Sequence, residues 1–192
     1  MKKNFLSNSP VIACVGLLFL LPGFNSVLAQ TPTYSVGSTT SGSNVIPFGN
    51  GTSWNSYRCQ FLYVPGDFGT VPSGMSISKI YFVPSNVNAT VTFTDFEVSI
   101  GQSTITSLSS TAWVTGLTPA INLPTYTFSA ATNQWWEITL PTPIPYDPTL
   151  SLIIDARKTS STHSVGLRNQ SGTGNRRAYA PHPSSTPSGA ST

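Results

Sequence analysis

The sequence predicts an all-β protein, an antiparallel β-sandwich with jelly-roll-like connections and about eight or nine strands. Short runs that alternate apolar and polar residues recur along the chain, and turns rich in Gly, Pro, Asn and Ser separate them. No segment keeps the apolar period of an amphipathic helix for three turns. With 192 residues, 39% of them hydrophobic, the chain can bury the core of one domain.

The first 29 residues read as a secretory signal peptide. Two lysines precede an apolar run at 11–21, and the small residues Val27 and Ala29 suit signal peptidase, so we expect cleavage after Ala29. No later stretch approaches the roughly 18 apolar residues of a membrane span. The expected location is therefore secreted, extracellular or at the cell surface, without a membrane span.

A lipoprotein is the alternative form of export, because the sequence VIAC at 11–14 matches a lipobox. A lipobox follows its hydrophobic run, however, and here the run continues past the cysteine, which favours soluble export. The expected organisation is a signal peptide at 1–29, a β-sandwich domain at 30–180 and a low-complexity tail at 181–192.

The first half of the domain begins with an expected edge strand at 33–36 and a long loop. Residues 56–64 alternate strictly, which predicts a half-buried strand with one apolar face, formed by Tyr57, Cys59, Phe61 and Tyr63. The runs at 75–83 and 91–100 each change phase once, the first near Lys79. A β-bulge in each run would keep both halves facing the core.

The second half holds further strand candidates. Residues 135–140 place Trp136, Ile138 and Leu140 on one face, and the proline-rich stretch at 141–149 fits only an extended edge or a turn. Residues 150–157 are apolar on both faces, as a central strand should be. The other expected strands lie at 112–117, 125–130, 163–169 and 175–180.

Three tryptophans are the candidate ligand-binding residues. Trp135 points away from the core face of its strand, beside Glu137, while Trp54 lies in a loop and Trp113 at the start of a strand candidate. Together they would form an exposed aromatic surface on which a sugar ring could stack. In the other interpretation each tryptophan fills a local gap under a loop.

The acidic residues give no convincing catalytic pair. Asp95 and Glu97 share a strand face, which resembles the paired acids of a glycoside hydrolase, but nothing supplies the different environments that an acid and a base need. A solvated face is the preferred interpretation, and Asp155 is expected to form an exposed ion pair with Arg157. We therefore expect no enzyme activity and no catalytic residues.

No metal or cofactor is expected either. His163 is the one histidine outside the tail, and the chain has no H-E-x-x-H, C-x-x-C or G-x-S-x-G motif. Cys59, the one cysteine after cleavage, reads as a small buried hydrophobe, with an intermolecular disulfide or reactive thiol as the alternative. The chain without its signal peptide has seven basic and six acidic residues, so it lacks the basic stripe of a nucleic-acid-binding protein.

The order of several segments, among them IPFGNGTSWNSYRCQFLYVPGDFG, FTDFEVSIGQSTITSLSS and WWEITLPTPIPYDPTLSLIIDAR, resembles a β-sandwich module. The module recurs in large secreted and surface proteins of bacteria that use the type IX secretion system. The likeness covers most of 45–180 and rests on strand pattern, so it brings no catalytic residues. Similar modules continue through another strand and such cargo carries a C-terminal sorting domain, so we expect a fragment or a missing last strand.

The resemblance implies an extracellular binding or structural role. The leading hypothesis is a secreted non-catalytic module that contributes adhesion, binding or structure at a bacterial surface or matrix. The alternative is a carbohydrate-binding module that uses its exposed aromatics, and a glycoside hydrolase is the third hypothesis. The expected partners are surface glycans or other surface proteins.

Overall fold

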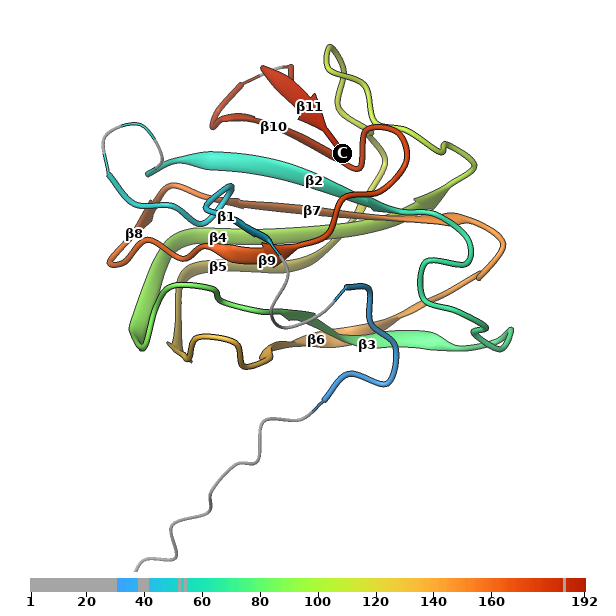
Figure 1. Ribbon diagram of the computed structural model, residues 1–192, viewed down its shortest axis with the longest axis horizontal. Coiled ribbons are helices and arrows are strands. Elements are labelled where there is room, and N and C mark those ends of the chain that lie inside the picture. The colour runs from blue at the N-terminus through green and yellow to red at the C-terminus, as the bar shows by residue number, and fades with distance from the viewer. Residues whose placement is uncertain (1–30, 38–41, 52, 54, 185) are drawn as a thin grey trace, which may run out of the picture.

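The computed structural model describes residues 31–37, 42–51, 53, 55–184 and 186–192, so the predicted signal peptide lies outside the described residues. Over these residues the protein is all-β, without a helix, and its 11 strands pair in antiparallel sheets. The strands form two packed layers, as predicted for a β-sandwich (Figure 1). The strand number exceeds the expected eight or nine because β1, β8 and β11 are only two or three residues long.

The large sheet contains most of the long strands. Its order is β11 (Gly189–Ser191), β10 (Arg177–Pro181), β2 (Tyr57–Tyr63), β7 (Ser151–Lys158), β4 (Ala89–Ser103) and β5 (Thr118–Ala130), and β8 (Ser160–Ser161) also pairs with β4. β7 lies between β2 and β4, which confirms the central strand predicted at 150–157.

The small layer faces it and is less continuous. β6 (Trp136–Pro145) pairs with β3 (Ser76–Phe82), and β9 (Leu167–Asn169) pairs with β1 (Gly42–Asn44). A single bridge between Pro84 and Leu167 joins the two pairs just beyond the end of β3. The chain crosses between the layers at most connections, so strands distant in sequence become neighbours (Figure 1).

The main core lies between the layers and is rich in aromatic rings. Phe93, Phe96 and Trp136 are buried there, and the Trp136 ring stacks on Phe128 with centroids 3.9 Å apart. Ile138 and Leu140 are also buried, which confirms the predicted core face of this strand. Burial of such large apolar side chains, at about 25 cal/mol per Å² of apolar surface, is the main stabilising term.

A second, smaller cluster covers the outer face of the large sheet. Leu62 and Ile153 pack there against side chains of the 104–117 loop. The prediction of a half-buried strand at 56–64 is therefore wrong, because Gln60 and Leu62 on the supposed solvent face are 0% and 2% exposed. The 104–117 loop covers this outer face of the strand, and the alternation of residues within the strand cannot predict that a distant loop packs on it.

The two predicted phase changes have different origins. In β3 the pairing register shifts between Ile77 and Lys79, at the predicted place, but the extra residues are on β6, where 140–143 lie opposite Ser78 alone. In β4 the phase changes at Asp95, which has a positive φ of 48°, but pairing with β5 keeps one register on both sides of it. Because Asp95 is left-handed, the side chains that follow it change faces of the sheet without an inserted residue. The register irregularity with β5 lies further along, between Val98 and Ser99.

Other local predictions need correction. Residues 33–36 and 112–117 form no strand, whereas the expected tail contributes β11, which pairs with β10. β5 and β6 run through several prolines and are longer than expected. Both are edge strands with a sheet partner on one side, so the missing amide protons are tolerated.

Candidate functional site

Two hollows adjoin at the open side of the small layer and form the candidate site. Their volumes are about 390 and 400 Å³, near the lower end of the range typical of ligand pockets. Four residues line both hollows and so mark their junction: Val36, Tyr63, Tyr81 and Trp135. We call the two hollows together the groove.

The first hollow, the aromatic hollow, follows the length of β3. Ser76 through Tyr81 line it, and on this side the described part of the chain offers β3 no paired strand. Residues 31–36 form another wall, and their exposure alternates so that Pro32, Tyr34 and Val36 are half-buried. The remaining lining is mainly apolar and aromatic: Phe68, Val71, Met75, Tyr146, Leu152 and Ile154.

Trp135 and Tyr81 are held in a fixed arrangement at the junction. Their ring centroids are 6.3 Å apart with an interplanar angle of 84°, an edge-to-face contact. The Tyr81 hydroxyl donates to Glu137 Oε2 at 3.0 Å, and Lys79 Nζ lies 2.9 Å from Glu137 Oε1. These contacts fix the Tyr81 ring, so it forms a rigid wall for a ligand.

The same contacts determine the ionisation of this corner. Burial and the hydrogen bond to Glu137 raise the pKa of Tyr81 to about 12, so the phenol stays neutral. Burial alone would raise the pKa of Glu137, but hydrogen bonds from Lys79, Thr139 and Tyr81 outweigh it and lower that pKa. Glu137 is thus a carboxylate that orients its neighbours, and it lacks the raised pKa of a general acid.

The second hollow, the arginine hollow, is more polar. It lies beside β9 and β10 and has amide side chains from Asn44, Asn169 and Gln170 in its lining. Its charged side chains are one carboxylate and three guanidinium groups, Asp67, Arg168, Arg176 and Arg177, and the terminal residue Thr192 also lines it. Such groups donate and accept directional hydrogen bonds, which apolar walls cannot provide.

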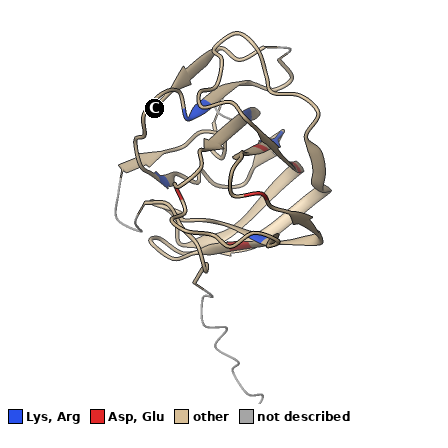
Figure 2. Cartoon of the chain, turned by 90° about the vertical axis from the view of Figure 1, so that its right-hand side faces the viewer, with Lys and Arg blue, Asp and Glu red and all other residues tan. Residues whose placement is uncertain are grey.

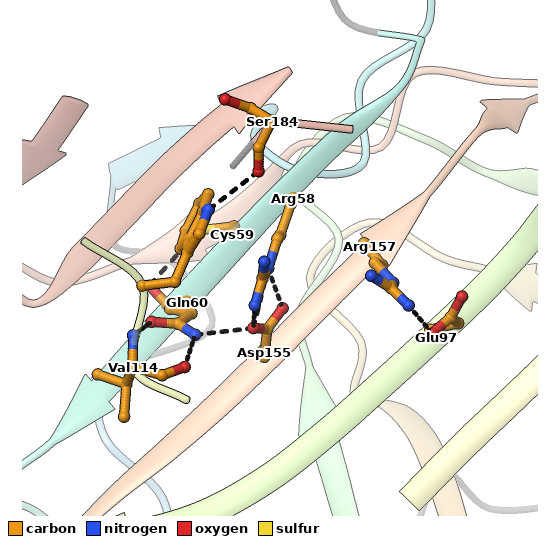
Figure 3. Close-up of polar contacts among 9 residues, drawn as sticks. Arg58, Cys59, Gln60, Glu97, Val114, Asp155, Arg157 and Ser184 are labelled. Atoms are coloured by element: carbon orange, nitrogen blue, oxygen red, sulfur yellow. Dashed lines mark hydrogen bonds and ion pairs between the residues drawn. The ribbon is translucent and has the colours of Figure 1, made fainter. Parts of the chain in front are cut away.

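A third hollow of about 490 Å³ lies on the outer face of the large sheet, and a partly buried ion pair lines it. Arg58 Nε donates to both oxygens of Asp155 at 3.1 and 3.0 Å, and Nη2 lies 2.6 Å from Oδ2 (Figure 3). Gln60 Nε2 donates to Asp155 Oδ2 at 2.8 Å, and the Gln60 amide exchanges two 2.9 Å hydrogen bonds with the backbone of Val114. Because the polar groups satisfy one another, this network anchors the 104–117 loop.

The predicted tryptophans do not form one surface. Trp135 lies in the groove, whereas Trp113 packs on the outer face of the large sheet, where the Arg58 guanidinium lies 4.3 Å from its ring centroid. Trp113 Nε1 also donates to Ser184 O at 3.2 Å, so this side chain has a packing role. Trp54 falls outside the described residues.

Sequence reasoning missed most of the groove. Tyr81 and Lys79 on the outward face of β3 and Glu137 on β6 become neighbours through strand pairing, and Tyr63 reaches the junction from the other layer. A weak signal existed for the first two, since Lys79 and Tyr81 alternate with the buried residues of their strand. The arginine hollow combines residues far apart in sequence and had no local signal.

The predicted pairing of Asp155 with Arg157 is wrong. Asp155 binds Arg58, and Arg157 forms an ion pair with Glu97 (Figure 3). Neither Asp95 nor Glu97 lines any of the three hollows, and Asp95 accepts a 2.8 Å hydrogen bond from the Thr159 hydroxyl. Figure 2 shows the charged residues as few and scattered over both layers.

All six carboxylates of the sequence are described, and each has a hydrogen-bond or ion-pair partner. Among the described residues no group of three or more His, Cys, Asp or Glu is placed to hold a metal ion. Cys59 is free and buried, as its predicted core role requires, and burial raises the pKa of its thiol well above the ordinary value.

Within the described residues no helix has the length and apolar character needed to cross a membrane. The chain matches no model of a known protein family, and no curated protein and no solved structure matches it.

Proposed function

We propose that this chain is a secreted, non-catalytic β-sandwich module with an adhesive or binding role at a bacterial surface, and that its groove binds an extended carbohydrate chain. The observation that carries the proposal is the pair of rings at the junction of the two hollows, Trp135 against Tyr81 at 84°. A site at a junction suits a polymer whose neighbouring units occupy both hollows.

The chemistry of the lining favours a sugar. A pyranose ring presents an apolar C–H face, which packs on aromatic side chains, and a rim of hydroxyl groups. Aromatic walls in one hollow and amide and guanidinium groups in the other match these two requirements. The phenol of Tyr63 adds a neutral hydroxyl, since burial raises its pKa to about 12.

The carboxylates support the non-catalytic part of the proposal. A glycosidase needs two carboxyl groups across the scissile bond, one with a raised pKa. The groove contains Asp67, ion-paired with Arg176 at 2.8 Å, and Glu137 adjoins it with a lowered pKa. Both are engaged in holding neighbouring side chains.

The bacterial-surface location rests on the sequence. The lysines and apolar run of the first 29 residues favour export, and the strand pattern resembles modules of type IX secreted proteins. Surface glycans are the polymers that such a module would meet first.

A glycan array with the chain from Gln30 onward tests the proposal. We expect saturable binding, at least a tenfold loss of affinity with Trp135→Ala and no loss with Trp113→Ala. Trp113 is the matched control, since it is a half-buried tryptophan on the opposite face. Near-ultraviolet circular dichroism must show that both variants are folded.

If a folded sample bound none of the glycans on the array, the carbohydrate proposal would be overturned. Equal losses with the two variants would overturn the location of the site in the groove, because Trp135 lines it and Trp113 does not.

A further inference from the structure

The arginine hollow has an excess of positive side chains. Of its three guanidinium groups, Arg176 forms an ion pair with Asp67 in the hollow, at 2.8 Å. Arg176 Nε also donates to Thr173 O at 2.7 Å, so this arginine is held by the loop before β10. Asp67 is the one carboxylate side chain in the lining, and it can compensate one guanidinium only.

Arg177 is the guanidinium least compensated by its surroundings. It lies opposite Phe61 in the sheet, so its side chain is on the inner face, toward the groove. Nη2 donates to Ser191 Oγ at 3.0 Å and Tyr179 lies below the group, but within the described residues it has no ion-pair partner. Nε is buried and has no hydrogen-bond partner there, so an incoming anion would contact this guanidinium through its terminal nitrogens.

Arg168 reaches the same hollow from β9. Its Nε and Nη2 both donate to Asn133 Oδ1, at 3.0 and 2.8 Å. An amide oxygen orients the guanidinium without neutralising its charge. Asn133 is two residues before Trp135, so this tether places a fixed positive charge close to the aromatic junction.

We propose that the arginine hollow selects acidic saccharides, so that a carboxylate or sulfate group of the sugar binds Arg168 and Arg177 while a neighbouring ring packs at Trp135. This inference rests on the proposed function and names its ligand class. Guanidinium groups bind such planar or tetrahedral oxyanions through paired, charge-assisted hydrogen bonds. In a hollow partly shielded from water these contacts are stronger than on an open surface.

The surroundings of the arginines favour a sugar over an acidic peptide. Trp135, Tyr81 and Phe61 line the arginine hollow too, and amide side chains lie beside them. Rings and amides suit a saccharide that carries an anionic group, whereas an acidic peptide needs only the charges.

Binding to oligosaccharide pairs that differ only in charge tests the inference, for example oligogalacturonate and its methyl ester within an array of acidic and neutral glycans. We expect at least tenfold tighter binding of acidic members and a decrease of affinity with salt. Arg177→Gln and Arg168→Gln should each remove at least tenfold of the acidic-ligand affinity. Arg157→Gln, the same charge change on the outer face of the large sheet, should leave it unchanged.

The outcomes separate the two proposals. Binding of neutral glycans with equal or higher affinity overturns the acidic class and leaves the carbohydrate proposal standing, whereas no glycan binding overturns both. Poly-glutamate that binds as tightly as the acidic glycans overturns the assignment to a sugar. If Arg177→Gln fails to fold, Arg168→Gln decides, and an unchanged preference in that variant overturns the role of the hollow.

Discussion

Lys158 makes the stability of the protein depend on pH in a defined direction. It lies at the end of β7 on the inner face and is 0% exposed, and its ammonium group donates to Gly49 O and Asn55 O at 2.7 and 2.6 Å. Burial disfavours the charged form and lowers the pKa of Lys158 from 10.5 to about 8. The folded protein therefore releases this proton at a lower pH than the unfolded chain does.

The sign follows from proton linkage. Between the folded pKa of about 8 and the unfolded value of 10.5 the unfolded state binds more protons, so the free energy of unfolding rises with pH. With these two values the contribution of Lys158 grows by about 2 kcal/mol from about pH 7 to about pH 9.5. Below the folded pKa the contribution is nearly constant.

Urea unfolding of the wild type and of Lys158→Met, followed by tryptophan fluorescence at several pH values, measures this effect. The variant loses the charge and the hydrogen bonds of the ammonium group. The difference in free energy of unfolding between the two proteins therefore contains several effects, and only its change with pH reports the titration of Lys158. Cys59 and the buried tyrosines have raised pKa values and act in the opposite direction, but they are common to both proteins and cancel. The reasoning would be refuted if the difference in free energy of unfolding between wild type and variant stayed constant within about 0.5 kcal/mol from about pH 7 to about pH 9.5, or changed in the opposite direction.

Two further predictions concern the large sheet. Arg58→Met should lower the free energy of unfolding by about 3 kcal/mol, because it leaves the carboxylate of Asp155, which is 5% exposed, without its cation. Arg157→Met should lower it by less than about 1 kcal/mol, because the partner of Arg157, Glu97, is partly exposed. Urea unfolding measures both, and equal costs would contradict the difference in burial. Cys59 should resist a thiol reagent in native buffer and react in step with unfolding in urea, because it is buried with a raised pKa. Rapid reaction of the folded protein would show that the thiol is accessible.

The faces of single strands were predictable because they depend on local alternation. Successive side chains on a strand point to opposite faces, so the pattern of 135–140 was enough to place Trp136 in the core and Trp135 outside it. The phase changes at 75–83 and 91–100 were visible for the same reason. The pattern could not tell the register shift between β3 and β6 from the left-handed residue in β4, Asp95, because both reverse the alternation.

Ion pairs were not predictable, because strand register decides them. Asp155 and Arg157 lie two apart on one strand, about 7 Å. Directly opposite residues on neighbouring strands approach to about 5 Å, and diagonal ones to about 7 Å. Pairing of β2 with β7 places Gln60 directly opposite Asp155 and Arg58 diagonal to it, and both side chains bind the carboxylate. Pairing of β4 with β7 gives Arg157 its own partner, Glu97.

The sequence by itself determined the fold class and the inner face of most strands, because both follow from periodicity and turn residues within short windows. The tertiary structure alone decided the groove, which assembles residues 31–36, the free side of β3, Trp135 and the arginines of β9 and β10. These segments span more than 100 positions of the sequence, and they meet because loops cover the strands and the two layers pack on each other. No short-range pattern encodes such contacts, since they depend on how whole layers meet.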